Sequence, residues 1–177
     1  MMKICLRNEK EVIIREAKKE DAQSMIDFYN LVGGETDFLS FGKNEFKRDL
    51  KEYESYLEST REEDNSIILL TIIDEQIAGI ASINSNQKVR TKHVGTLGIV
   101  VAEQYCGLGL GGEMVDYLIE WAKLNGITKK ISLLTREDNT RAIELYKKVG
   151  FETEGILKKD NYINGVYYNT LMMSLIV

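Results

Sequence analysis

The order of the elements predicted from the sequence indicates an α+β fold, with a partly antiparallel sheet and helices on both of its faces. Short apolar runs typical of strands gather towards both ends of the chain, and a strand–helix–strand–helix order fills its middle. A chain of 177 residues is long enough to bury a core, and no linker, repeat or low-complexity tract divides it. We therefore expect a single domain over residues 1–177.

The first part of the chain predicts strands from short apolar runs and helices from apolar residues at helical spacing. The expected strands are Val12–Arg15, Ile67–Ile73, Ile77–Ile83 and His93–Val101, the middle two forming a hairpin. The expected helices run from an N-cap at Asp21 to Asn30 and from about Asn44 to Arg61, the second with Phe46, Leu50, Tyr53 and Leu57 on one face.

The second part alternates helices with strands and ends in a hairpin. The expected helices are Gly109–Asn125, with Gly126 after its last turn, and Asn139–Val149, ended by Gly150. The expected strands are Ile131–Thr135, Phe151–Leu157 and Tyr167–Ile176, the last two antiparallel across a turn at Asn161–Gly165.

Composition argues against several classes of partner. A net charge of −5 is unsuited to a nucleic-acid backbone, which requires basic patches. Cys5 and Cys106 are far apart and lack metal-type spacing, so we expect reduced thiols, no bound metal and a cytoplasmic protein. No window approaches the roughly 20 apolar residues of a membrane span, so we expect no membrane partner.

A glycine-rich loop at Gly107–Gly112 follows one predicted strand and opens a helix. Backbone amides of such a loop can approach an anion closely, and a helix N-terminus favours a pyrophosphate. The literal G-x-G-x-x-G spacing also fits a nicotinamide dinucleotide, but the motif comes late and residues 102–106 separate it from its strand. A turn that only packs helix against strand is the third interpretation.

Two motifs together resemble the GCN5-related N-acetyltransferase (GNAT) family. They are Val101-Ala-Glu-Gln-Tyr-Cys-Gly-Leu-Gly-Leu-Gly111 and Asn139-x-x-Ala142-x-x-x-Tyr146-x-x-x-Gly150-Phe151. The resemblance implies a mixed, mostly antiparallel sheet with splayed strands at the cofactor site, and direct acetyl transfer from acetyl-CoA without a metal. Cys106 stands where the family usually has Arg or Gln, which matters little if the loop binds through main-chain amides.

The resemblance also implies the residues of the site. The cofactor-binding set is Ile99, Val100, Val101, Gly107, Leu108, Gly109, Leu110, Gly111, Gly112, Asn139, Ala142 and Tyr146. Tyr146, about two helical turns after Asn139, is expected to donate a proton to the departing thiolate as general acid. Helical spacing alone would make Tyr146 a core residue, and the whole motif favours the catalytic role. The general base is left open between Glu103, Glu35 and a water chain, and for each glutamate the favoured interpretation is a solvated surface acid.

The chain also resembles the bacterial branch of this family that acts on amino acids and small amines. This resemblance implies that the acceptor is the primary amine of a small molecule: a small amine or an amino acid first, then a polyamine or antibiotic-like amine, then a protein N-terminus. We expect the Leu31–Phe41 segment and Tyr162, Tyr167 and Tyr168 to select it. These tyrosines also fit a homodimer contact or buried packing. A non-catalytic acetyl-CoA sensor and a nicotinamide-dependent oxidoreductase remain as alternative functions.

Overall fold

The computed structural model describes residues 2–6 and 10–177. The strands are β1 (Met2–Cys5), β2 (Glu11–Glu16), β3 (Ile67–Ile73), β4 (Gln76–Ser85), β5 (Val94–Val101), β6 (Lys130–Arg136), β7 (Glu152–Ile163) and β8 (Val166–Ile176). The helices are α1 (Ala22–Val32), α2 (Leu50–Arg61), α3 (Leu110–Leu124) and α4 (Thr140–Lys148). Short 3-10 turns lie at Lys19–Asp21 and Glu103–Tyr105.

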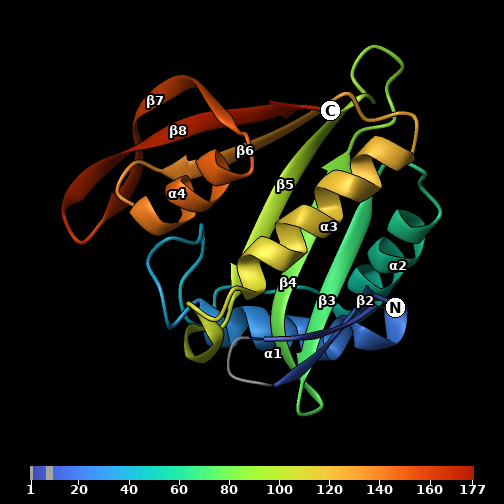
Figure 1. The fold of residues 1–177 in the computed structure, drawn as a ribbon. Coiled ribbons are helices and arrows are strands. Elements are labelled where there is room, and N and C mark those ends of the chain that lie inside the picture. The colour runs from blue at the N-terminus through green and yellow to red at the C-terminus, as the bar shows by residue number, and fades with distance from the viewer. Residues whose placement is uncertain (1, 7–9) are drawn as a thin grey trace.

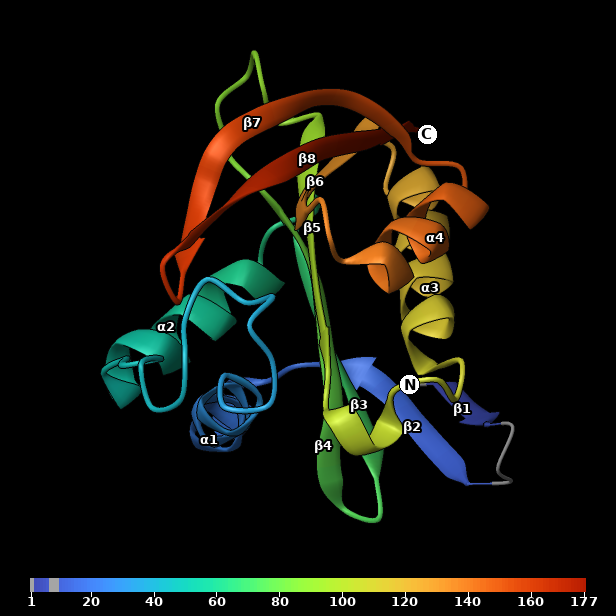
Figure 2. The same cartoon turned by 90° about the vertical axis from the view of Figure 1, so that its left-hand side faces the viewer.

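All described strands join one eight-stranded sheet in the order β1-β2-β3-β4-β5-β6-β8-β7 (Figure 1). Its pairs are antiparallel except for β5 with β6, which run parallel. Helices α1 and α2 cover one face and α3 and α4 the other (Figure 2). The predicted α+β class, with a mixed and mostly antiparallel sheet between helical layers, is confirmed.

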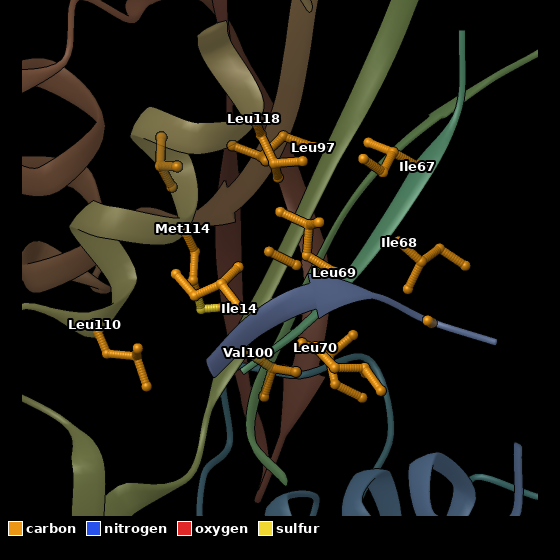
Figure 3. Close-up of a cluster of buried hydrophobic side chains, with 14 of the residues drawn as sticks. Ile14, Ile67, Ile68, Leu69, Leu70, Leu97, Val100, Leu110, Met114 and Leu118 are labelled. Atoms are coloured by element: carbon orange, nitrogen blue, oxygen red, sulfur yellow. The ribbon is translucent and has the colours of Figure 1, made fainter. Parts of the chain in front are cut away.

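The core lies where α3 crosses the centre of the sheet. Leu110, Met114 and Leu118 point from α3 toward the strands, where they meet residues such as Leu69 and Leu97 (Figure 3). Burying one side chain of this size contributes roughly 1.5–3 kcal/mol. Strand β3 is buried on both faces because helices cover both sides of the sheet, which explains why all its residues except Thr71 are apolar. This packing fixes the N-terminus of α3 against the end of β5.

The second helix is shorter than predicted. It begins at Leu50 rather than Asn44, and Asp49 caps it by accepting a hydrogen bond from the Glu52 amide at 3.0 Å. Phe46 fits the helical spacing but lies in the preceding segment, where its amide donates to Asn30 Oδ1 at 3.1 Å. A tertiary hydrogen bond therefore holds Phe46 outside the helix to which its spacing had assigned it.

Asp21 is the N-cap residue of α1, as the sequence predicts, but its side chain makes no capping hydrogen bond to the helix. It has helical dihedral angles and ends the 3-10 turn that precedes α1. Its carboxylate instead accepts from the Lys18 amide at 2.8 Å and forms an ion pair with Arg15 at 2.7 Å. Both partners lower the pKa of this half-buried carboxyl against the opposing effect of burial.

The edges of the sheet also differ from prediction. Strand β1 was not predicted, because its run is short and only half-buried. The last hairpin is longer than expected: β7 extends to Ile163 and turns at Asn164 and Gly165, both with positive φ. The turn of this hairpin reaches over the α2 side of the sheet (Figure 2).

Candidate active site

The parallel pair β5–β6 is short, and the two strands separate beyond it. Their pairing covers residues 94–96 of β5 and 130–132 of β6. From there β5 stays paired only with β4, and β6 only with β8. The facing edges of the two strands are therefore free to accept another extended chain. The splayed strands expected from the resemblance are present.

The hydrogen bonds between β5 and β4 show which main-chain groups of β5 face this gap. Ala102 donates its amide to Ala78 of the β4 strand at 3.0 Å, and the Val100 carbonyl also faces β4. Because successive residues of a strand point to opposite sides, the N–H and C=O groups of Ile99 and Val101 face the gap. Val100 lies in the expected cofactor-binding set, but its main chain faces β4 and its side chain is buried.

The glycine loop offers a run of free amide donors. Cys106 donates to Glu103 and Glu113 donates to Gly109, but within the described chain no group accepts from the amides of residues 107–112 between them. Gly107 and Gly109 have φ of +87° and +94°, a region that side-chain-bearing residues rarely adopt. Six consecutive N–H groups at the positive end of α3 are therefore left without an acceptor in the described chain, which suits an anion such as a pyrophosphate.

The gap, the glycine loop and α4 converge at Gly111. A Cβ built on this residue would lie 3.8 Å from Ile99 Cδ1 and 3.5 Å from Leu145 Cδ2. Leu145 immediately precedes Tyr146 on α4. The structure thus brings together elements that the sequence places about 40 residues apart.

Asn139 and Tyr146 occupy opposite ends of α4. Asn139 is the N-cap, and its Oδ1 accepts from the Ala142 amide at 3.3 Å, while its Nδ2 donates to no group among residues 2–6 and 10–177. The Tyr146 ring is buried and lies 5.8 Å from the Phe151 ring, measured between centroids. Burial raises the pKa of its phenol to about 12, and within the described residues the hydroxyl has no hydrogen-bond partner. A neutral phenol without a protein acceptor is suited to donate to a ligand.

Arg141 is a candidate ligand residue that motif reasoning missed. Its Nη2 atom lies 3.1 Å from the place where a Cβ on Gly107 would stand, so the guanidinium covers the glycine loop. The sequence could have indicated this residue, because Arg141 lies inside the second motif, two residues after Asn139.

We expect Arg141→Ala to weaken acetyl-CoA binding about five- to tenfold, because a partly exposed charge-assisted hydrogen bond to phosphate is worth roughly 1 kcal/mol. Titration calorimetry at low and high salt measures this. The difference between wild type and variant should shrink at high salt. Equal binding by both proteins at low salt would remove Arg141 from the site.

The two candidate bases lie together at the end of β5. Glu35 Oε2 accepts a hydrogen bond from the Glu103 amide at 2.9 Å. Glu35 is half-buried and Glu103 is exposed. Partial burial raises the pKa of the nearby Cys106 thiol, which makes this cysteine a poor nucleophile at neutral pH. Of these groups, Glu35 is the one that a main-chain contact holds in place.

Arg136 is a second residue that the sequence did not single out. It is buried at the end of β6, pairs in bidentate fashion with Asp138 at 2.7 and 2.8 Å, and donates to the Asp37 carbonyl at 2.9 Å. Its guanidinium lies 4.7 Å from the Phe38 ring centroid and 4.0 Å from that of Tyr168. The Arg136 side chain therefore connects the Leu31–Phe41 segment to β6 and to the last hairpin. A lone arginine at the end of a predicted strand is too common a pattern to have indicated this role from the sequence.

We expect Arg136→Ala to lower the unfolding free energy by about 2 kcal/mol, because several hydrogen bonds and two ring contacts are lost together. Chemical denaturation measures the change. Arg136→Lys should not restore stability, since an ammonium lacks the planar fork that meets Asp138 and Asp37 at once. Full rescue by lysine would show that charge alone is required.

The tyrosines of the last hairpin lie in two different environments. Tyr162 and Tyr167 are 63% and 58% exposed and form a cross-strand pair with ring centroids 4.8 Å apart. Buried packing is therefore the wrong interpretation for these two. Tyr168 contacts Arg136 and so lies beside the Leu31–Phe41 segment.

An open mixed sheet with splayed central strands, beside a helix N-terminus lined with amides, is suited to a phosphate-bearing ligand with an extended arm. The chain matches the Acetyltransferase (GNAT) family over residues 34–151 and belongs to that family. The resemblance that the sequence predicts is confirmed. The nicotinamide alternative loses its basis, because a doubly wound dinucleotide fold requires a parallel sheet.

Known relatives and structures give the same family. The L-amino acid N-acetyltransferase AaaT of Escherichia coli (strain K12) is 33% identical over 110 residues, covering 60% of this chain and 65% of that protein. Spermidine N(1)-acetyltransferase of the same strain is 30% identical over 77 residues, covering 44% of this chain and 41% of that protein. The matched segments thus span less than two thirds of these relatives.

Among solved structures, a GNAT-family acetyltransferase from Streptococcus pneumoniae is 35% identical with a TM-score of 0.91, covering 94% of this chain and 99% of that chain. The structure of yncA from Salmonella typhimurium, which contains its cofactor acetyl-CoA, has a TM-score of 0.80 at 19% identity, with 93% of each chain covered. Within residues 2–6 and 10–177, no helix is long and apolar enough to cross a membrane, and no cluster of three His, Cys, Asp or Glu side chains could hold a metal ion.

Proposed function

We propose that this chain is an acetyl-CoA-dependent N-acetyltransferase acting on the primary amine of a small molecule, with an amino acid as the first candidate. The observation that carries the proposal is the run of six free amides at residues 107–112, directly beside the open edge of β5. The amides hold the pyrophosphate of acetyl-CoA, and Arg141 and Asn139 add polar contacts from α4. The pantetheine arm lies in the gap and pairs with Ile99 and Val101 as an added strand.

The chemistry is direct transfer without a covalent enzyme intermediate. The neutral amine attacks the thioester carbonyl carbon, a C–N bond forms, and the tetrahedral intermediate collapses with cleavage of the C–S bond. A main-chain amide of β5 at the gap stabilises the developing oxyanion. The Tyr146 phenol donates a hydrogen bond to the departing sulfur. Since a thiol has a pKa near 8.5, well below that of Tyr146, the phenol assists without losing its proton completely.

Glu35 is the proposed base. An amine acceptor is mostly protonated at neutral pH and must lose a proton before or during attack. One oxygen of Glu35 is fixed by the Glu103 amide, and the other has no partner within the described chain. The free oxygen accepts the proton directly or through a water molecule.

We expect Glu35→Gln to lower kcat/KM for the amine about tenfold or more at neutral pH. The loss should shrink at high pH, where the acceptor is already neutral. Glutamine keeps a carbonyl oxygen for the Glu103 amide, so the fold is retained. Steady-state rates across pH for Glu35→Gln and Glu103→Gln decide between the two carboxylates; a loss confined to the Glu103 variant would move the role to Glu103.

The experiment that tests the whole proposal is acetyl-CoA turnover across a panel of amino acids, polyamines, antibiotic-like amines and a peptide N-terminus, followed by thiol release and product mass. Amine-dependent thiol release supports an enzyme. Acetyl-CoA binding without turnover of any amine would favour the non-catalytic sensor instead.

A further inference from the structure

A hollow of about 450 Å³ is lined by residues of α1, α2, the segment between these helices, and the strands β3 and β4. Helices α1 and α2 lie on the opposite face of the sheet from α3, the helix that the glycine loop opens (Figure 2). The size of the hollow is within the range of small-molecule sites. Its walls are mostly aromatic and its floor is formed by strand residues; the lining residues are Tyr29, Phe41, Phe46, Arg48, Glu52, Tyr53, Tyr56, Ile68, Ser82 and Asn84. We call this hollow the aromatic cavity.

Five rings of the aromatic cavity form a continuous wall. Centroid distances are 5.8 Å from Phe41 to Tyr29, 4.5 Å from Tyr29 to Phe46, 5.9 Å from Phe46 to Tyr53 and 5.7 Å from Tyr53 to Tyr56. Burial raises the pKa of both Tyr29 and Tyr53 above the usual range, so these rings stay uncharged. The wall is suited to a flat or bulky apolar group.

Hydrogen bonds hold the aromatic cavity in shape without a ligand. Asn30 accepts from the Phe46 amide and donates to the Phe46 carbonyl, both at 3.1 Å, which fixes this ring to α1. Tyr56 Oη donates to Asn84 Oδ1 at 2.9 Å, and Asn84 Nδ2 donates to Ser82 Oγ at 2.9 Å. A preformed cavity loses little conformational freedom on binding.

One floor residue of the aromatic cavity lies next to β5, the strand that borders the gap. Ser82 pairs with Gly98 of the neighbouring strand β5, about 4.8 Å away in the sheet. Gly98 is exposed, and a Cβ there would lie 3.3 Å from Ser82 Oγ, so glycine keeps this position clear. The next residue, Ile99, faces the gap with its main chain. A ligand seated in the cavity can therefore extend an amine toward the thioester.

A positively charged side chain lies beside the rings of the aromatic cavity. The Arg48 guanidinium lies 5.6 Å from the Phe46 centroid, and no carboxylate of residues 2–6 or 10–177 forms an ion pair with it. An arginine held on an aromatic face with its fork free is suited to bind a carboxylate.

We propose that the acceptor is an α-amino acid with a large apolar, preferably aromatic, side chain, which fills the aromatic cavity while Arg48 binds its carboxylate. This inference rests on the proposed acetyltransferase function and narrows its acceptor. A polyamine has no carboxylate for Arg48 and no ring for the wall, although Glu52 in the same lining offers one negative charge.

Paired substrates separate the two contacts. L-phenylalanine and L-alanine differ by the ring, and L-phenylalanine and phenethylamine differ by the carboxylate. We expect KM to rise at least tenfold on losing either group, with kcat changing less. The Arg48→Ala variant then tests whether Arg48 binds the carboxylate. It should raise KM for L-phenylalanine about tenfold and leave KM for phenethylamine unchanged. This comparison cancels the difference in amine basicity between the two substrates.

Lys47→Ala is the matched control, because it removes a neighbouring exposed cation that does not line the aromatic cavity. Its KM for L-phenylalanine should equal that of wild type. Thermal stabilisation by N-acetyl-L-phenylalanine, which needs no turnover, should be present in wild type and reduced in Arg48→Ala. Arg48 is exposed, so its loss should leave the unfolding temperature of the free protein unchanged.

The outcomes distinguish this inference from the function on which it rests. Turnover of spermidine in preference to every amino acid, or equal KM for L-alanine and L-phenylalanine, would overturn the inference while the acetyltransferase function stands. An equal loss in Lys47→Ala and Arg48→Ala would also overturn it. Absence of acetyl transfer to any amine would overturn the proposed function itself.

Discussion

Tyr146→Phe is expected to lower kcat about 10²-fold while acetyl-CoA binds with an unchanged dissociation constant. The hydroxyl is the only group lost, and it acts on sulfur as the C–S bond breaks. The ring stays buried against Phe151, so the fold is retained. Stopped-flow or steady-state thiol release gives kcat, and calorimetry with CoA gives binding.

The pH profile gives a second readout for Tyr146. Because burial raises its pKa to about 12, the phenol keeps its proton throughout the usual assay range. Rates should therefore rise with pH as the amine deprotonates and show no falling limb from Tyr146 up to about pH 11. Tyr117→Phe, which removes a half-buried hydroxyl from α3, is the control and should behave as wild type. Unchanged kcat in Tyr146→Phe would remove the assigned acid.

Gly109→Ala is expected to weaken acetyl-CoA binding at least tenfold. At φ of +94° a Cβ costs roughly 1–2 kcal/mol, and the loop relieves this strain by turning its amides away from the phosphate position. No atom lies within 4 Å of the added Cβ, so backbone strain is the only effect. Calorimetry gives the dissociation constant and thermal unfolding gives the stability.

Gly126→Ala supplies a matched control for that strain. Gly126 follows the other end of α3, has φ of +74°, and likewise has no atom within 4 Å of its Cβ position. Both variants should lose similar stability, but only Gly109→Ala should lose affinity for CoA. Equal affinity in the two variants would show that the glycine loop does not bind the phosphates.

Local patterns in the sequence predicted the elements that carry the proposed donor site. The glycine loop before one helix, the start of the next helix at Asn139 and the burial of Tyr146 that helical spacing indicates each depend on residues within one or two helical turns. Tertiary contacts decided the rest. Hydrogen bonds to Asn30 hold Phe46 outside its predicted helix, and the Asp21 carboxylate at the N-cap of α1 pairs with Arg15 instead of bonding to the helix amides. Arg136 has one partner nearby in the chain, Asp138, and contacts the distant Asp37 carbonyl as well. The aromatic cavity combines α1, α2 and two strands, and no single stretch of sequence displays it.

The central claim is that acetyl-CoA lies on the amides of residues 107–112 with its arm in the gap of β5. Titration of the ¹⁵N-labelled protein with CoA, followed amide by amide in ¹H–¹⁵N spectra, tests it most directly. We predict the largest shifts at the amides of residues 107–112 and at Ile99 and Val101, with Gly126 unmoved. Binding of CoA with no shift in the glycine loop would contradict the account.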